Sequence, residues 1–493
     1  MIPVLLIFIP LFSGLAAFFL KNEKTARSWA LISTILILGI SLMGLTFFND
    51  EKYLAFQGEW LQTLGSSFSV KLDGMGQLLC LLTAVAYPII FIATWNTSYK
   101  KANNFFAQML LAQAGLMGVF LSMDALLFYF FWELALIPMY FLCSQWGGEK
   151  RIRVTFKFFI YTFVGSLLML VGILFVYSKT AGHSFDIKSF YSVVLTSNQQ
   201  NLVFWLMFIA FAIKMPIFPL HTWQPDTYEQ SPTATTMVLS GIMVKMGLFG
   251  MLRWLFPVVT GMSYAWGDFI TPLAIVGMIY ASLIAMQQDD LKRLVAYSSI
   301  AHIGLMCVGA FTQNTSGLQG VMFQMFSHGI NIIGLWIVVE WIERNLGTRK
   351  ISELGGLAQK APSLAIFLVI IALANIALPL TNAFPGEFLI FNGLLSSSTK
   401  YYVLFTVMAG ICIILAAVYT LRMIRKVFYG ETNQLTEGAV DIGFHEKLAL
   451  GFIVVMIFWL GLFPQTMLDL TADVTKTLTN EFEMLRYNLP KLK

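Results

Sequence analysis

Six titratable side chains stand inside long apolar stretches of this chain, where charge is costly. A charged group at the centre of a membrane costs from about 2.5 to more than 10 kcal/mol, so such residues usually mark ion paths or paired sites. They are Glu133, Lys214, Lys245, His302, His328 and Glu387. Metal ions or organic solutes would require clustered carboxylates or a wider polar lining. We therefore predict a proton relay formed by these six residues.

Each of these residues also has a purely structural interpretation. A single histidine in a span is often a hydrogen-bonded packing residue, and Glu133 with one lysine could form a buried ion pair of little net stability. Asp124 and Arg253 lie nearer the ends of apolar stretches. We expect Asp124 to end a helix in a short turn and Arg253 to extend its guanidinium to an interface. Packing alone does not easily explain two lysines and two glutamates in one set of spans.

Two pairs of prolines lie beside these charges. Pro216 and Pro219 follow the first lysine, and Pro379 and Pro385 precede the last glutamate. A proline break exposes backbone carbonyls and amides, which a membrane tolerates only where they are buried in protein or face water. Interrupted spans at corresponding positions of two halves are typical of inverted repeats. We therefore expect each break to form a polar, hydratable pocket in which a lysine can exist.

The elements that position these residues are membrane-spanning helices. Of the 493 residues, 58% are hydrophobic and only 12% are charged, whereas a soluble domain has about 25% charged residues. At roughly 20 apolar residues per span, we predict an all-α integral membrane protein with about 14 transmembrane helices. They lie near 2–20, 28–48, 76–96, 105–122, 125–143, 158–178, 202–219, 233–255, 268–287, 294–311, 318–341, 363–396, 401–424 and 448–465.

Lysine and arginine are unevenly divided between the two sets of connections. Nineteen lie in the odd-numbered connections between the predicted helices, which join the first helix to the second, the third to the fourth and so on. Six lie in the even-numbered connections and four in the C-terminal tail. Cytoplasmic loops carry the excess of positive residues. Both termini are therefore predicted on the non-cytoplasmic side. The tail after about residue 466 could form a surface helix.

The cysteines offer no redox or metal chemistry. Their spacing contains no CxxC pair, so we expect no iron–sulfur cluster, no zinc site and no disulfide framework. They are Cys80, Cys143, Cys307 and Cys412. One remote alternative is a membrane cytochrome in which His302 and His328 bind haem b. That alternative leaves both buried lysines unexplained.

Four stretches of the chain resemble the antiporter-like, proton-translocating subunits of respiratory complex I. They are FSVKLDGMG (68–76), FYFFWELALIPMYFL (128–142), FAIKMPIFPLHTWQPDTYEQSPTATTMVLSGIMVKMGLFGMLR (211–253) and QQDDLKRLVAYSSIAHIGLM (287–306). The resemblance, which covers about residues 65–430, implies two inverted five-helix repeats, helices 4–8 and 9–13, with discontinuous helices 7 and 12. The expected parts are helices 1–3 in 1–104, the first repeat in 105–255, the second in 268–424, and helix 14 with the tail in 448–493.

The resemblance also implies a role for each candidate residue. Glu133 and Lys214 match the family's input-side ion pair, and Lys245 matches its central relay lysine. His302 and His328 match polar relay positions in helices 10 and 11. The helix-12 position separates the members, since many carry lysine there and the M group carries glutamate. This chain has glutamate, so it resembles the M group of bacterial NADH-quinone oxidoreductases most.

The function implied by this resemblance is proton transport in the membrane arm of an NADH:quinone oxidoreductase. Electron transfer would occur in partner subunits, which would bind NADH, FMN, iron–sulfur clusters and quinone. The expected partners are other membrane-arm subunits, especially the two other antiporter-like subunits, and the lipid bilayer, with no nucleic acid. The expected location is the bacterial cell inner membrane. The alternatives are a subunit of a multisubunit cation/proton antiporter or of a membrane-bound hydrogenase.

Overall fold

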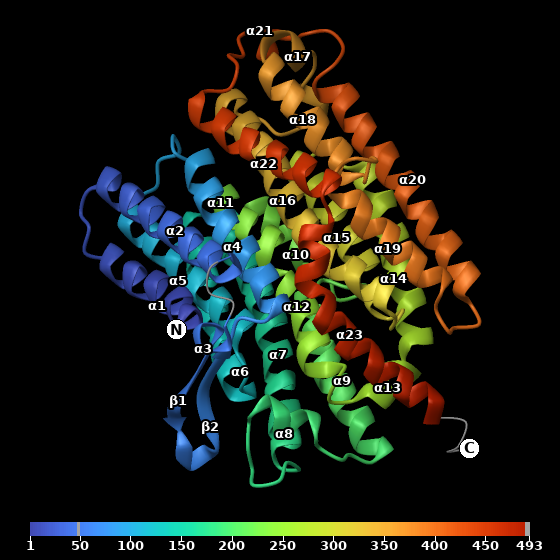
Figure 1. Cartoon of the computed structure of the whole chain (residues 1–493). Helices are drawn as coiled ribbons and strands as arrows, with labels where there is room; N and C mark the ends of the chain where they lie inside the picture. The colour runs from blue at the N-terminus through green and yellow to red at the C-terminus, as the bar shows by residue number, and fades with distance from the viewer. Residues whose placement is uncertain (47–49, 489–493) are drawn as a thin grey trace.

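The chain folds into a bundle of long helices that stand side by side (Figure 1). The computed structural model describes residues 1–46 and 50–488. Within this part, eleven helices are long and apolar enough to cross a membrane, so the chain is a multi-pass membrane protein. They are α2 (Glu23–Thr46), α4 (Gly74–Ala93), α5 (Ala102–Leu121), α6 (Ala125–Trp146), α7 (Arg151–Tyr177), the central helix Thr233–Leu255, α14 (Gly267–Gln287), α15 (Leu291–Ala310), α16 (Thr315–Leu346), α20 (Tyr402–Val427) and α22 (Phe444–Leu462).

Two further apolar segments are interrupted, as the prolines predicted. After α9 (Ser197–Lys214), the chain turns through Pro216 and Pro219 and continues as α10 (Trp223–Gln230). After α18 (Pro362–Asn375), it turns through Pro379 and continues as α19 (Ala383–Leu395). The fourth proline, Pro385, lies in the first turn of α19, where a missing N–H costs no helical hydrogen bond. A shorter apolar helix, α1 (Ile2–Ala17), begins the chain.

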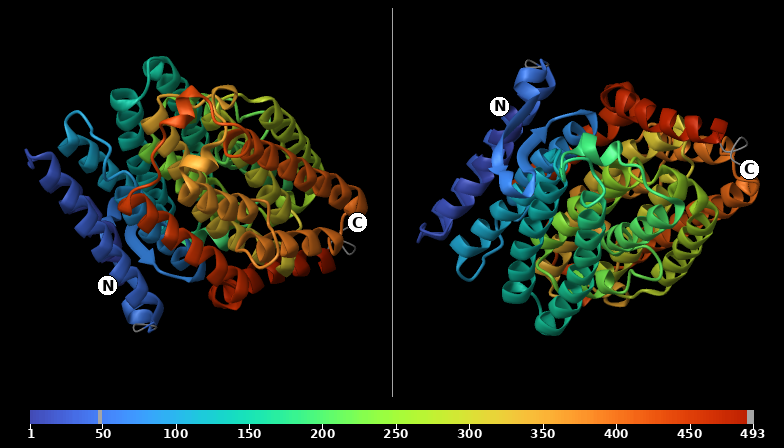
Figure 2. Two further views of the ribbon diagram at one scale, coloured as in Figure 1. Left: turned by 90° about the horizontal axis from the view of Figure 1, so that it is seen from above. Right: turned by 90° about the horizontal axis from the view of Figure 1, so that it is seen from below.

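The central helix is fully buried and is not a uniform α-helix. It comprises α11 (Thr233–Val238), the π-helical segment η2 (Leu239–Met243), α12 (Lys245–Gly250) and a second π-helical segment, η3 (Met251–Leu255). Seen along the helices, α1 and α2 lie at one side of the bundle and α20 at the other, while the last helices, α22 and α23 (Gln465–Asn488), pack on α4 (Figure 2). The central helix packs on α16, the longest helix in the described part of the chain, which is buried along most of its length.

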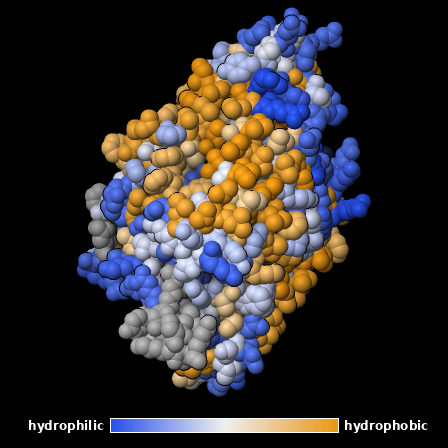
Figure 3. Space-filling view, turned by 90° about the vertical axis from the view of Figure 1, so that its right-hand side faces the viewer, coloured by the Kyte–Doolittle hydropathy of each residue, from blue (hydrophilic) through white to orange (hydrophobic). Residues whose placement is uncertain are grey.

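The outer helices present apolar side chains to the surroundings. Exposed hydrophobic residues recur along α2, α7 and α20, including Ile32, Phe156 and Ile414. Figure 3 shows one face of the molecule, on which hydrophobic residues cover a broad area and hydrophilic residues gather at the top. This distribution is expected of a protein whose sides contact lipid and whose ends contact water.

One end of the bundle carries a small β-hairpin that the all-α prediction did not include. Strand β1 (Ala55–Leu61) pairs in antiparallel register with β2 (Ser66–Lys71). Gly65 closes the turn with a φ of 72°, and a Cβ there would lie 2.1 Å from the carbonyl oxygen of His183. This position therefore requires glycine. Three short helices accompany the hairpin: α3 (Glu51–Leu54), α8 (Ile187–Tyr191) and α13 (Thr260–Ala265).

The tail forms a helix, as predicted. This helix, α23 (Gln465–Asn488), packs on α4, α13 and α16 and runs towards the lower right in Figure 1. Its buried residues recur every three or four positions, which is the spacing of one helix face. They are Met467, Thr471, Thr475, Leu478, Thr479 and Phe482. The opposite face is mostly polar, so α23 is an amphipathic helix that lies along the outside of the bundle (Figure 2).

Candidate functional site

Lys245 and His328 meet at the centre of the bundle. The Lys245 ammonium donates a hydrogen bond to the carbonyl of Ser240 at 2.8 Å, and its Nζ lies 2.8 Å from Nδ1 of His328. A lysine ammonium has only donors, so Nδ1 is the acceptor and the proton of a neutral His328 is on Nε2. Nε2 has no partner among the described residues. The contact is short enough for direct transfer of a proton.

Local backbone features bring these two side chains together. Lys245 follows the π segment η2, and such segments frequently occur at functional sites. On the facing helix, a Cβ at Gly329 would lie only 2.9 Å from the carbonyl oxygen of Gly241. Two glycines therefore allow the central helix and α16 to approach closely enough for Lys245 to reach His328.

His302, on α15, lies beside His328 and extends the contact into a row of three titratable side chains. Its ring centroid lies 5.5 Å from that of His328. Its Nδ1 lies 2.8 Å from the carbonyl oxygen of Ser298, and its Nε2 lies 2.8 Å from the carbonyl oxygen of Asn375. Carbonyl oxygens only accept, and a neutral imidazole donates through one nitrogen, so only an imidazolium satisfies both contacts. Asn375 is the last residue of α18, which places His302 at the second helix break.

Glu387 lies at the far end of the row, on α19. It is 5% exposed, and Nε2 of Gln324 donates to its Oε1 at 3.4 Å. Glu387 and His302 line the same cavity of about 20 Å³. The rest of the lining is apolar and includes Met278 and Leu305, so this cavity is the space that the two titratable side chains share. Four of the six predicted residues, from Lys245 to Glu387, thus form one connected set.

The other two residues, Glu133 and Lys214, lie apart from this set. Lys214 is the last residue of α9 and is buried, and its Nζ has no hydrogen-bond partner within the described residues. It lies 5.5 Å from the ring centroid of Trp132, the residue before Glu133. Oε1 of Glu133 is likewise buried without a partner. No nitrogen–oxygen distance between the two residues falls within the 4.0 Å of an ion pair, so this pair is open.

The first helix break is held beside the central helix. The indole N–H of Trp223, at the start of α10, donates to the carbonyl of Ile213 at 3.0 Å. A Cβ at Gly247 would lie 2.6 Å from the carbonyl oxygen of Phe211. The end of α9, with Lys214, thus packs directly on the turn that follows Lys245.

The structure corrects the expectation for Arg253. Its guanidinium does not extend to an interface but is buried, and it forms a bidentate ion pair with Asp73 at 2.6 Å for each contact. Asp73 is the N-cap of α4 and also accepts a hydrogen bond from the Gly76 amide at 3.0 Å. The interface prediction failed because it did not consider this partner from a distant segment. Asp124 is a helix-end residue, as expected, and caps α6 through the amides of Leu126 and Leu127.

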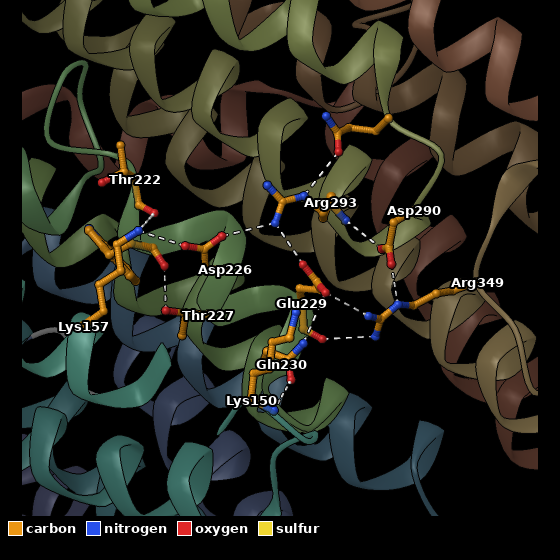
Figure 4. Close-up of polar contacts among 12 residues, drawn as sticks. Lys150, Lys157, Thr222, Asp226, Thr227, Glu229, Gln230, Asp290, Arg293 and Arg349 are labelled. Atoms are coloured by element: carbon orange, nitrogen blue, oxygen red, sulfur yellow. Dashed lines mark hydrogen bonds and ion pairs between the residues drawn. The ribbon is translucent and has the colours of Figure 1, made fainter. Parts of the chain in front are cut away.

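A network of ion pairs joins the two halves at the end opposite the hairpin (Figure 4). Arg293 of α15 contacts Asp226 at 3.2 Å and Glu229 at 2.9 Å, both on α10. Arg349 contacts Glu229 at 3.2 Å, and Lys157 of α7 contacts Asp226 at 2.8 Å. Burial alone would raise the pKa of Asp226, but Lys157 and Arg293 hold this pKa below its ordinary value. A pocket of about 790 Å³ opens beside the network.

The histidines do not fit haem ligation. Both ring nitrogens of His302 contact carbonyl oxygens, so His302 has no free nitrogen for a haem iron. Nδ1 of His328 contacts Lys245, which leaves only its Nε2 free. Within residues 1–46 and 50–488, no group of three or more His, Cys, Asp or Glu side chains is placed to hold a metal ion. The four cysteines are buried and unpaired.

A buried row of titratable groups in a bundle with two broken helices defines a class, the ion-translocating membrane proteins. The family described as NADH:quinone oxidoreductase/Mrp antiporter, TM, matches residues 122–413, and the chain belongs to this family. The chain is 36% identical to NADH-quinone oxidoreductase subunit M of Rickettsia typhi, over 94% of this chain and 95% of that protein. It is 32% identical to F(420)H(2) dehydrogenase subunit M of Methanosarcina mazei, over 97% and 99%.

The fold agrees with these relatives. A chain of respiratory complex I from Thermus thermophilus superposes with a TM-score of 0.89 at 27% identity, covering 97% of this chain and 100% of that one. The breaks, the central helix and the six titratable residues therefore lie in a scaffold that a complex I chain shares over its full length.

Proposed function

We propose that this chain is a proton-translocating subunit in the membrane arm of an NADH:quinone oxidoreductase. The observation that carries this proposal is the 2.8 Å contact between Lys245 and His328 in the buried centre of the bundle. Two protonated groups at this distance would repel each other strongly in a buried site, so the pair holds one proton in the hydrogen bond between them. The row continues through His302 to the cavity at Glu387. The enzyme in this proposal is the one named for the relative from Rickettsia typhi.

In the proposed mechanism, the Glu133–Lys214 pair controls loading of the relay. When the pair closes, the carboxylate stabilises the protonated form of Lys214, and when it opens, as here, that stabilisation is lost. A pair at about 4 Å is worth at most ~4 kcal/mol at an effective dielectric of 20. Moving one charge against about 100 mV costs ~2.3 kcal/mol. One such change is therefore sufficient to drive a proton from Lys214 towards Lys245.

The proposed architecture has fourteen membrane crossings. The eleven long helices are joined by α1, by the α9–α10 pair and by the α18–α19 pair. Two inverted five-helix repeats would occupy 105–255 and 268–424, with breaks in helices 7 and 12, and 1–104 and 448–493 would flank them. The excess of Lys and Arg in the odd-numbered connections supports termini on the non-cytoplasmic side.

The proposed setting is a multisubunit enzyme in the bacterial cell inner membrane. Partner subunits would bind NADH, FMN, iron–sulfur clusters and quinone, and the neighbours of this chain would be two other antiporter-like subunits. The relative from Methanosarcina mazei favours a second candidate, in which the same relay serves a complex with a different electron donor. Oxidation of NADH by membranes that contain this chain separates the two candidates.

The test measures quinone reduction and proton pumping together, in membranes with Lys214→Ala or Glu133→Gln. We expect both activities to fall while the complex still assembles, because the relay can no longer be loaded. A matched control is Glu149→Gln, which alters an exposed carboxylate on the loop after α6. Normal pumping by both relay variants would show that these residues are structural. Pumping without NADH oxidation in the wild type would indicate the antiporter or hydrogenase alternative.

A further inference from the structure

The hairpin end of the molecule contains a pocket that the proposed relay does not use. It has a volume of about 660 Å³ and opens between the hairpin, α3 and α8. Asp73 and Arg253 line it, and the two residues are 18% and 8% exposed in their side chains. This pocket leads towards the lower end of the central helix, which carries Lys245.

The ion pair in this pocket is held from three directions. Both terminal nitrogens of Arg253 contact the two carboxylate oxygens of Asp73 at 2.6 Å. The hydroxyl of Tyr191, on α8, donates to the carbonyl of Arg253 at 2.8 Å. Asp73 in turn caps α4. A bidentate pair with both partners fixed is more rigid than the surface ion pairs elsewhere in the chain.

Arg253 stands between this pocket and Lys245 on the same helix. The two residues are eight positions apart, which corresponds to about 12 Å along the helix axis. The ring of Phe249 fills this interval, 5.4 Å from the guanidinium. Phe120 and Phe128 pack against Phe249 at ring distances of 5.4 Å and 6.3 Å. Water from the pocket would therefore have to pass the guanidinium and then an aromatic layer.

We propose that Arg253, fixed by Asp73, closes the first half of the chain to protons and other cations at the hairpin end. Arginine suits this role because its guanidinium is not deprotonated in proteins and so cannot pass a proton on, unlike Lys214 or Lys245. A fixed positive charge also repels approaching cations, and arginines at constrictions exclude protons and cations in pores.

The second half is different at the same end. A pocket of about 290 Å³ lies there between α14, α15 and α19, and its deeper lining consists of neutral groups such as Thr271, Thr312 and Gln313. Its charged residues, Asp268 and Lys400, are exposed, and no arginine lines it in the described part of the chain. Within residues 1–46 and 50–488, a buried arginine thus closes the first half but not the second, so a proton leaving Lys245 would leave through the second half.

The experiment measures passive proton leak and requires no turnover. The whole complex is reconstituted in liposomes with pyranine inside, and the lumenal pH is followed after an external pH step without NADH or quinone. The decisive comparison is Asp73→Asn against Asp73→Asn/Arg253→Met, because both retain an N-cap side chain and only the double variant lacks the arginine. Lys71→Gln is the control, since Lys71 lines the same pocket but pairs with exposed Glu51.

We expect the double variant to leak about tenfold faster, the factor for a barrier lowered by ~1.4 kcal/mol. Lys71→Gln should retain the wild-type rate, and Asp73→Asn should leak clearly less than the double variant, because its less firmly held guanidinium keeps the positive charge. Equal rates for Asp73→Asn and the double variant would overturn the proposal, because the arginine would then make no difference. If the double variant does not assemble, Arg253→Gln against Lys71→Gln gives the same decision. This proposal rests on the proposed function only because it names the proton as the excluded cation. The leak is measured without turnover, so its result does not depend on whether the relay variants pump.

Discussion

Nζ of Lys245 lies 2.8 Å from Nδ1 of His328, and the two residues are 83 positions apart in the chain. One belongs to the first half of the molecule and the other to the second. In the proposed relay, this contact is therefore where the first half would pass a proton directly to the second.

This contact predicts non-additive effects on pumping. Lys245→Ala and His328→Ala should each reduce proton pumping by about tenfold or more, while the double variant should be little worse than either. The reason is that each single change already interrupts the same transfer. Pumping and quinone reduction in reconstituted complex provide the measurement, and Lys476→Ala on the exposed face of α23 is the lysine control. Effects that simply multiply would mean that the residues act on separate paths.

The approach of the central helix to α16 predicts that Gly329→Ala is damaging. The new Cβ would lie 2.9 Å from the Gly241 carbonyl oxygen, and a backbone atom cannot move away cheaply. We expect a loss of roughly 1–3 kcal/mol of stability together with reduced pumping, because the helices separate at Lys245. Thermal unfolding of the purified complex measures the first effect. Gly410→Ala is the control, since nothing lies within 4 Å of its Cβ, and equal behaviour of the two variants would contradict the packing argument.

The docking of α23 should depend on pH through Glu481. Burial raises the pKa of this carboxyl to about 7, compared with about 4.3 in an unfolded chain. The protonated form is thus favoured in the docked helix, and its contribution is complete below the unfolded pKa and is lost as the pH rises through 7. Hydrogen exchange of α23 amides should become faster from about pH 6 to 8, after correction for the intrinsic rate.

The control for this prediction is Glu481→Gln, which cannot ionise. Its α23 should remain protected across the same pH range, while the neighbouring Phe482 still packs on Phe256 at 5.6 Å. If wild type and variant show the same pH response, another group controls the docking of the helix.

The ion network at the opposite end should be insensitive to pH. Because Lys157 and Arg293 lower the pKa of Asp226, this carboxylate contributes stability above its unfolded pKa near 3.9 and loses it only as the pH falls through the lowered value. Asp226→Asn should therefore destabilise the chain by about 1 kcal/mol, as expected of half-exposed pairs. The loss should be equal at about pH 6 and 8.

Thermal unfolding at both pH values tests this prediction, with Glu149→Gln as the control. A loss that grows between the two values would mean that a different titrating group dominates the network.

Much of the fold follows from hydrophobicity and proline. Each long apolar run became a helix, and Pro216, Pro219 and Pro379 lie in the turns that break two of them. Such features depend on local sequence, which is why composition and spacing predict them. The hairpin at 55–71 was not predicted, because its strands are short and partly polar and depend on a tertiary contact at Gly65.

The sequence identified candidate residues for the site but not the distances between them. Charge inside apolar runs identified Lys245, His328 and the other four, since such charge is rare in spans. The open state of Glu133 and Lys214 could not be predicted, because it depends on side-chain rotamers. The π segments around Lys245 also lack a signature in the residue pattern, because a glycine such as Gly241 also occurs in uniform α-helices such as α5. Arg253 was misjudged because its partner Asp73 is 180 positions away.

The two carbonyl contacts of His302 have a mechanical consequence. Only the contact to Asn375 joins α15 to the end of α18, because Ser298 lies in α15 with His302. A neutral imidazole has one N–H and can donate to only one of the two carbonyls. Loss of a proton from Nδ1 would therefore leave the two helices joined, whereas loss of a proton from Nε2 would set a nitrogen lone pair against the Asn375 oxygen and loosen the joint at the second helix break.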